Sequence, residues 1–213
     1  MAYVFKTENL SVGFDMHYPI LEDINITLNQ GDFACLIGSN GCGKSTFIKT
    51  ISGVLPKCGG EINIDSKTRI SMVPQFKKIQ YQYPLTVRDV LLLSEKFSFL
   101  KKKEFTKNQM AVIQSIDIES ILSLLIRECS GGQLQKVLIA RSLLSDANLI
   151  FLDEPMDALD SKSKRNITEI LKMEIKEKNK SIFIITHNVE SSWISEFNRV
   201  FVVNDRKIME TKK

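Results

Sequence analysis

A phosphate-binding loop of the form G-x-x-x-x-G-K-S occupies residues 38–46, which read Gly38-Ser39-Asn40-Gly41-Cys42-Gly43-Lys44-Ser45-Thr46. Its glycines let the backbone wrap closely around phosphate, and its N–H groups point inward at the start of a helix whose dipole favours anions. Lys44 is then placed to reach the β- and γ-phosphates, and the Ser45 hydroxyl to ligate Mg²⁺. The alternative is a glycine-rich turn that only starts a helix. Because an apolar β-type run precedes the loop and a helical pattern follows it, the sequence predicts a nucleoside triphosphate site.

An acidic pair, Asp153 and Glu154, follows the apolar run at 149–152 and precedes Pro155. Such runs are typical of strands buried on both faces of a parallel sheet, and open sheets of this kind bind ligands at the carboxyl ends of their strands. We therefore expect the pair to lie beside the phosphate loop, where Asp153 holds Mg²⁺ through water and Glu154 polarises the attacking water. The alternative is an ordinary acidic turn at a strand end.

Two further groups have the chemistry to contact phosphate. Ser130 is the predicted N-cap of a helix over Gly131–Leu144, so the helix start and the amides of Gly131 and Gly132 present donors to an anion. That anion must come from outside, because the chain's own nucleotide is held by the phosphate loop. His187 follows a second predicted buried strand at 182–186, and we expect it to contact the γ-phosphate. A structural histidine is the alternative.

Taken in order along the chain, these motifs resemble the ATP-binding-cassette (ABC) ATPase family, whose signature is usually written L-S-G-G-Q-x-Q-R. The resemblance covers about residues 9–203. Gln75 matches the family's Q-loop, and Asp160 matches its D-loop. Phe14 lies where the family places an aromatic that stacks on adenine, although a core aromatic is the alternative there. The chain departs from the family's pattern at Cys129, where Leu is usual, and at Lys136, where Arg is usual.

The resemblance also implies roles for the matching residues, with ATP and Mg²⁺ as the ligands. It implies that catalysis uses Glu154, His187, Gln75 and Lys44, and that Mg²⁺ is ligated by Ser45, Gln75 and Asp153. It implies a head-to-tail dimer, in which each ATP lies between the phosphate loop of one chain and the signature of the other. The nucleotide contacts it implies come from Phe14, from all nine residues of the loop, and from Ser130, Gly131, Gly132, Gln133 and Asp160.

The elements that position these residues are predicted from hydrophobic patterns. Alternation over the first ~30 residues indicates half-buried antiparallel strands, and 61–65 and 69–73 indicate two more strands. Residues 87–129 have a helical, glycine-free pattern. The predicted fold is therefore a single α/β P-loop NTPase domain over 1–213. Its core and antiparallel β-subdomain comprise 1–86 and 130–213, its sheet is mainly parallel, and 87–129 is an inserted α-helical subdomain.

Composition narrows the class of protein further. No apolar run approaches the ~20 residues needed to cross a bilayer, and the N-terminus lacks the pattern of a secretory signal, so the cytoplasm is predicted. The four cysteines lack metal-ligand spacing and are predicted to be free thiols. A net charge of +4 is too small to argue for nucleic acid. The basic patches are predicted to be solvated helix faces rather than binding surfaces, and they comprise Lys96, Lys101, Lys102, Lys103 and Lys107, then Lys172, Lys176, Lys178 and Lys180.

The family's classes suggest what the ATPase would power. Long heptad coiled coils, a second cassette and membrane-spanning segments are absent from the sequence. We therefore expect a homodimeric or paired ATPase, peripherally associated with the inner face of the membrane, that docks on an integral membrane permease and, through it, acts with a solute-binding protein. The segment 73–90 resembles the branch serving zinc, manganese and iron-chelate importers. The alternative is a soluble ABC ATPase that remodels a non-membrane partner.

Overall fold

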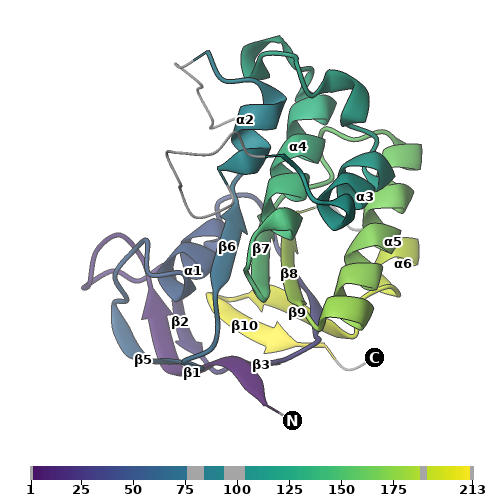
Figure 1. Ribbon diagram of the computed structural model, residues 1–213. Coiled ribbons are helices and arrows are strands. Elements are labelled where there is room, and N and C mark those ends of the chain that lie inside the picture. The colour runs from purple at the N-terminus through teal and green to yellow at the C-terminus, as the bar shows by residue number, and fades with distance from the viewer. Residues whose placement is uncertain (1, 76–83, 94–103, 188–190, 212–213) are drawn as a thin grey trace.

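The computed structural model describes residues 2–75, 84–93, 104–187 and 191–211 of the 213-residue chain. It contains two sheets with helices packed on them, which confirms the predicted α/β class (Figure 1). In the smaller sheet, β1 (Tyr3–Val12) pairs antiparallel with β2 (Leu21–Ile24), β3 (Thr27–Asn29) and β5 (Gly59–Ile64). The antiparallel strands predicted from the alternating pattern are therefore present.

The larger sheet has six strands in the order β10-β9-β4-β8-β7-β6. Five of them run parallel, and only β10 runs antiparallel to its neighbour. The carboxyl ends of the parallel strands therefore share one edge, where such sheets place their ligands. The strands are β4 (Phe33–Ile37), β6 (Ile70–Val73), β7 (Leu149–Asp153), β8 (Ser181–Thr186), β9 (Arg199–Asn204) and β10 (Lys207–Glu210).

Helices connect and cover the strands. The phosphate-loop helix α1 (Lys44–Ile51) follows β4 directly. The longest helices are α4 (Gly131–Leu144) and α5 (Ser161–Lys178), while α6 (Ser191–Ile194) is one turn. Helical structure is also present in the described part of 87–129, as α2 (Val87–Leu92), α3 (Lys107–Ser115), η2 (Glu119–Ile121) and η3 (Ile126–Glu128). In Figure 1 these four elements lie around α4, away from the smaller sheet, and the subdomain division stays a prediction.

The central strands are buried on both faces, as their apolar runs predict. Phe151 of β7 and Phe183 of β8 pack on the side of the smaller sheet, whereas Ile150 and Ile184 pack on the opposite side. On the first side an aromatic cluster joins the two sheets. The ring of Phe5 in β1 lies 6.5 Å from that of Phe47 in α1, 6.2 Å from Phe151 and 6.3 Å from Phe183. The helix that begins at the phosphate loop is thus fixed between both sheets.

Lys180, which was predicted to lie in a solvated basic patch, is buried instead. The side chain of Lys180 is only 6% exposed, and its Nζ donates to the carbonyl oxygens of Leu143 at 3.0 Å and Ser145 at 3.1 Å. These carbonyls lie at the end of α4, where no intrahelical donor can reach them. Burial lowers the pKa of Lys180. The prediction of a solvated side chain was wrong for Lys180, because the carbonyl oxygens at the end of α4 need a donor. Lys96 and Lys101–103, in the other predicted patch, lie outside the described residues.

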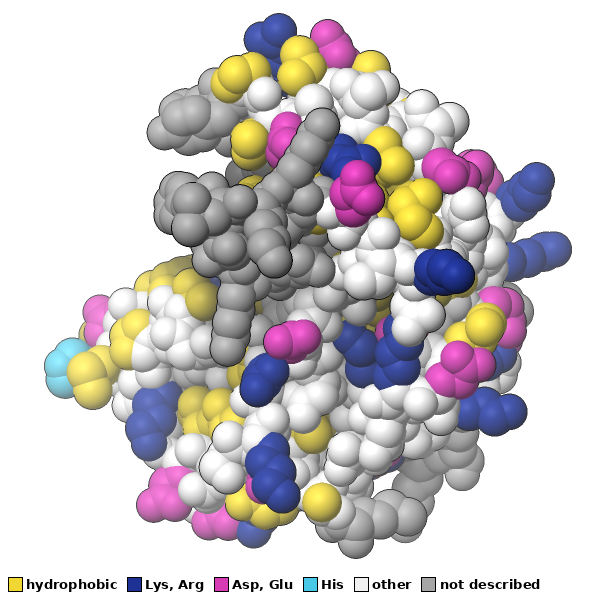
Figure 2. Space-filling model, in the orientation of Figure 1, with side chains coloured by type: hydrophobic (Ala, Val, Ile, Leu, Met, Phe, Trp, Pro, Cys, Tyr) yellow, Lys and Arg dark blue, Asp and Glu magenta, His cyan; other side chains and the backbone are white. Residues whose placement is uncertain are grey.

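Charged side chains of both signs are scattered over the visible surface, among hydrophobic and uncharged polar groups. Over the described residues of the face in Figure 2, Lys and Arg lie interspersed with Asp and Glu. Exposed ion pairs are present on the surface of the described residues, such as Lys6 with Glu8 at 2.6 Å and Lys207 with Asp23 at 2.9 Å. Pairs of this kind contribute little to stability, so they serve mainly as a hydrated surface.

Candidate functional site: a phosphate-loop cavity at the sheet edge

Four of the predicted site elements follow strands of the larger sheet at its shared edge. The phosphate loop follows β4, and Gln75 lies two residues beyond β6. Asp153 ends β7, and His187 immediately follows β8. These strands are parallel and adjacent in the sheet, so their carboxyl ends lie at the same edge. The residues that follow each strand are therefore close together, although they are far apart in the sequence.

The phosphate loop depends on a glycine at position 43 for two reasons. Gly43 has φ 102°, a left-handed backbone conformation that residues other than glycine rarely adopt. A Cβ there would also lie 2.8 Å from Cγ2 of Ile20 and 2.9 Å from Cγ of Leu21. The loop can therefore close down on β2 and start α1 at Lys44 only with glycine in this place.

Lys44 is held at the centre of the loop by the loop's own backbone. Its Nζ donates to the carbonyl oxygens of Gly38 at 2.7 Å and Ser39 at 2.9 Å, and the residue is 6% exposed. The same nitrogen lies 3.9 Å from Oε1 of Glu154. A buried ammonium between the loop and a carboxylate is a suitable partner for phosphate oxygens.

A cavity of about 550 Å³ adjoins the loop and brings together most of the predicted residues. It is large enough for a nucleotide-sized ligand. Phe14 lies on its wall with 77% of its surface exposed, so a ring face is available to a planar base. The predicted residues that line the cavity are Phe14, Asn40, Gly41, Gly43, Lys44, Ser45, Thr46, Gln75, Asp153, Glu154 and His187.

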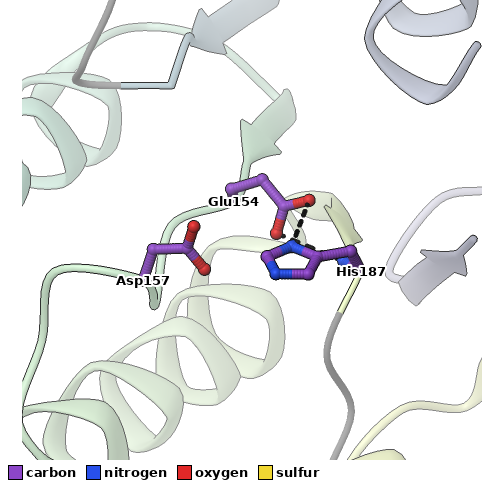
Figure 3. A group of neighbouring side chains, drawn as sticks. All are labelled: Glu154, Asp157 and His187. Carbon is purple, nitrogen blue, oxygen red and sulfur yellow. Dashed lines mark hydrogen bonds and ion pairs between the residues drawn. The ribbon is translucent and has the colours of Figure 1, made fainter. Parts of the chain in front are cut away.

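Glu154 and His187 form a close pair inside this cavity. His187 Nδ1 lies 3.0 Å from Oε1 of Glu154, and the backbone N–H of His187 donates to Oε2 at 3.3 Å (Figure 3). Glu154 is 6% exposed and has φ 52°, an unusual left-handed conformation for a side chain of this size. Local strain of this kind clusters at functional sites, and here it aims the carboxylate back at the strand end that carries His187.

Asp157 is a cavity residue that the sequence reasoning missed. Its carboxylate approaches the Glu154–His187 pair, with one ligand atom of each residue within 4.8 Å of the others (Figure 3). The only sequence signal was its position within the predicted D-loop, in which Asp160 was the residue predicted to contact nucleotide. Ile20 and Lys49 also line the cavity and were not predicted.

Asp160 itself lies outside the lining of the cavity and caps α5. Its Oδ1 accepts from the Ser163 backbone N–H at 2.8 Å, and its Oδ2 accepts from the Ser163 hydroxyl at 3.0 Å. These hydrogen bonds, the backbone one first, lower the pKa of Asp160, and the charge of Lys136 acts in the same direction. A nucleotide contact by Asp160 stays a prediction.

The signature residues also lie apart from the cavity lining. Ser130 caps α4 as predicted: its hydroxyl oxygen accepts from Gln133 N at 3.2 Å, while Gln133 Oε1 accepts from Ser130 N at 2.8 Å. This capping box uses both side chains and leaves the Ser130 O–H free to rotate toward an external acceptor. The geometry suits an anion that approaches from outside the chain.

The two departures from the signature pattern have clear structural places. Cys129 packs against the core, with its Sγ 3.7 Å from the Leu125 carbonyl oxygen. Lys136 pairs with Asp117 at 3.6 Å, which ties α4 to the turn after α3. Both residues therefore affect how α4 packs, and neither lines the cavity next to the phosphate loop.

We expect Cys42 to be the thiol whose modification controls nucleotide binding. It lies half-buried in the phosphate loop, and a Cβ on Gly38 would lie only 2.7 Å from its sulfur. A maleimide attached there would obstruct the loop, so labelling should abolish ATP binding and bound ATP should slow it. Buried Cys35 is the internal control, because burial raises the pKa of its thiol to about 12.

The labelled positions can be identified by mass spectrometry. Cys58 and Cys129 would be replaced by Ser to leave only Cys35 and Cys42. Full ATP binding after confirmed labelling at Cys42 would contradict the prediction.

Comparison with known protein families gives a consistent match. Residues 21–157 match the family model described as ABC transporter. The chain is 33% identical to the zinc transport system ATP-binding protein TroB of Treponema pallidum, over 98% of this chain and 81% of that protein. It is 33% identical to the manganese transport system ATP-binding protein MntB of Bacillus subtilis, over 95% of this chain and 84% of that protein.

Solved structures show the same fold. An inward-facing metal-chelate type ABC transporter aligns with a TM-score of 0.81 and 25% identity, over 99% of this chain and 83% of that chain. The protein cbiO1 of Clostridium perfringens, part of the ABC transporter complex cbiONQ, aligns with a TM-score of 0.80 and 25% identity, over 98% and 88% of the two chains. Among the described residues, none of the helices has the length and hydrophobicity needed to span a bilayer.

Proposed function

Because the chain belongs to the ABC transporter family and is an ATP hydrolase of that family, we propose that it powers a separate membrane permease that imports metal ions. The observation that carries the proposal is the cavity in which the phosphate loop, Asp153, Glu154 and His187 meet. The cargo is inferred from relatives named for zinc and manganese transport. The proposed location is the cytoplasmic face of the membrane, with a solute-binding protein delivering cargo to the permease.

The residues of the cavity fit a magnesium nucleotide. Ser45, Gln75 and Asp153 contribute a hydroxyl, an amide and a carboxylate to the lining of the cavity, and Mg²⁺ prefers oxygen ligands. When bound, Mg²⁺ would neutralise charge on the β- and γ-phosphates. Phe14 would stack on the adenine, and the loop amides with Lys44 would hold the phosphates.

Hydrolysis is assigned to the pair at the end of β7 and β8. Glu154 would accept a proton from the attacking water, which requires the carboxylate to be ionised and close to the nucleophile. His187 would orient that carboxylate through the 3.0 Å contact and reach the γ-phosphate with its other nitrogen. Glu154 and Lys44 are each 6% exposed, so their electrostatic interactions act largely away from solvent.

The transport proposal can be tested in cells that lack the chain. Wild-type chain should restore accumulation of zinc or manganese and should be recovered from solubilised membranes together with an integral membrane protein. Matched Glu154→Gln chain should still be recovered with the membrane protein but fail to restore accumulation. Recovery with a non-membrane partner, at unchanged metal content, would instead support a remodelling ATPase.

We further propose that two copies assemble head to tail, so that each ATP meets the loop of one chain and Ser130–Gln133 of the other. A chain carrying Lys44→Ala and a chain carrying Ser130→Arg should each be inactive alone. Mixed together, they can form one intact composite site, from the loop of the second and the signature of the first. Each mixed dimer should have up to roughly half of the activity of a wild-type dimer, since one of its two sites is complete, and an equimolar mixture that pairs at random should therefore recover up to roughly a quarter. A hydrolysis rate that stays linear in protein concentration down to a demonstrated monomer would contradict this arrangement.

A further inference from the structure

The start of the signature helix touches the loop that leads out of the chain's own catalytic strand. A Cβ built on Gly132, the second residue of α4, would lie 2.9 Å from the carbonyl oxygen of Ala158. That separation is shorter than real Cβ contacts, and the opposing atom is backbone, so no side-chain rotation can relieve it. Glycine at this position is therefore required by a contact within the chain, apart from any contact with a partner's phosphate.

The loop on the other side of this contact, residues 154–160, has little freedom to move away. It begins with the Glu154 N–H bonded to the Ile185 carbonyl oxygen at 3.0 Å and ends with Asp160 capping α5. Between these ends, the Asp157 N–H bonds to Glu154 O at 3.4 Å and the Leu159 N–H to Met156 O at 3.2 Å. Because both ends of the loop and its two overlapping turns are hydrogen-bonded, we expect a displacement at Ala158 to disturb the turn that holds Asp157.

Apolar packing fixes the same loop onto α4. Met156 and Leu159 are each 7% exposed and belong to the core cluster that contains Val137 and Leu138 of α4. Leu134 of α4 packs against that cluster as well. The carbonyl of Ala158 is thus held near Gly132 by Leu159, the next residue, and by Met156, two residues before it, because these apolar side chains cannot move away without exposing buried surface.

The residue next to Ala158 reaches the catalytic pair. Asp157 directs its carboxylate toward Glu154 and His187, within the 4.8 Å that encloses one ligand atom of each (Figure 3). The carboxyl group of Asp157 thus adds a negative charge beside the group that must accept a proton. Any shift of the Ala158 backbone moves this charge relative to Glu154.

We propose that Gly132 is a positioning residue for the ATPase site of its own chain: its bare Cα lets the signature helix support the 154–160 loop and so places Asp157 beside Glu154 and His187. The proposal deepens the composite-site proposal, on which its activity test rests. One helix start would serve two sites, presenting donors outward to the partner's nucleotide and holding the catalytic loop inward. Movement of α4 when the partner's nucleotide binds would then reach the chain's own Glu154 through a single backbone contact.

The first test uses the single chain and does not depend on dimerisation. Gly132→Ala should speed amide hydrogen exchange in the 154–160 segment by about tenfold, because the displaced loop loses the hydrogen bonds of the Asp157 and Leu159 N–H groups. The matched control is Gly59→Ala, where the added methyl would find its nearest neighbour, Cβ of Ser11, at 3.9 Å. Unchanged exchange in a folded Gly132→Ala chain would overturn the proposal.

The second test separates the inward role from the outward one. In the mixture of Lys44→Ala and Ser130→Arg chains, the second chain supplies the loop, Glu154 and Asp157, while its own signature is already disabled. Adding Gly132→Ala to that chain should lower turnover by about tenfold with the KM for ATP within twofold, since small misplacements of catalytic groups are costly. Adding Gly59→Ala there should change neither.

The outcomes of the two tests are distinguishable. If the parent mixture recovers no hydrolysis, the composite site is wrong, and the exchange measurement alone decides the inward role of Gly132. If the parent mixture is active and Gly132→Ala leaves turnover within twofold of it, Gly132 does not position the site, and the proposal is overturned.

Discussion

Glu154→Gln is expected to lower ATP turnover by at least about 100-fold while leaving ATP affinity within about twofold. A general base or water-orienting carboxylate contributes on the order of 100- to 10,000-fold to rate. The amide keeps the shape of the side chain, so its oxygen can still accept from the His187 N–H that lies 3.3 Å from Oε2. Binding should survive because the phosphate contacts come from the loop, and the bound ATP should then trap a dimer.

Single-turnover kinetics and titration calorimetry separate the two effects, and size-exclusion chromatography with ATP detects the dimer. Glu61→Gln, an exposed residue of β5, is a matched control that should behave as wild type. Near-normal turnover in Glu154→Gln would show that another group activates the water.

Lys44→Ala is expected to weaken ATP binding itself, by roughly 10- to 150-fold in Kd. Hydrogen bonds to charged groups contribute about 1.5 to 3 kcal/mol, which corresponds to that range. The buried Nζ lies between the loop carbonyls and Glu154, so its removal deletes the cation nearest the expected β- and γ-phosphates. Loss of turnover should accompany the loss of affinity.

Lys49→Ala provides the control for Lys44→Ala because it removes the same side chain from the same helix. Lys49 also lines the cavity, but it lies beyond the first turn of α1. We expect its effect on Kd to stay within about threefold, as for a partly solvated charge. ATP affinity that is unchanged in Lys44→Ala, measured by calorimetry on folded protein, would exclude the loop as the phosphate cradle.

The parts of the site that were predictable from sequence are those encoded in short, local patterns. The loop at 38–46 is one run of residues, and the buried strands β4, β7 and β8 have recognisable apolar runs. Once those strands are parallel neighbours, Asp153 and His187 must meet at one edge, as the structure confirms. Ser130 as an N-cap is equally local, since the capping box closes within four residues.

What could not be predicted depends on contacts between distant segments. The burial of Lys180 follows from the place where α4 ends, which the residues around Lys180 do not reveal. Asp157 and Asp160 lie in the same short loop, and only the course of its turns decides which carboxylate faces the cavity and which caps α5. The Gly132–Ala158 contact joins segments 26 residues apart (158 − 132), so a glycine that seemed to serve phosphate alone also has a neighbour within the chain.

The alternation of side chains along β7 and β8 has a thermodynamic consequence. Each strand contributes alternate residues to both hydrophobic clusters, so neither cluster can come apart without stripping one face from strands that the other needs. The two sheets should therefore melt in one cooperative transition rather than in stages. The nucleotide cavity lies at the end of those same strands, so a ligand there stabilises the whole transition. At a hundred times its Kd, ATP would add about 2.7 kcal/mol to the free energy of unfolding of the entire molecule.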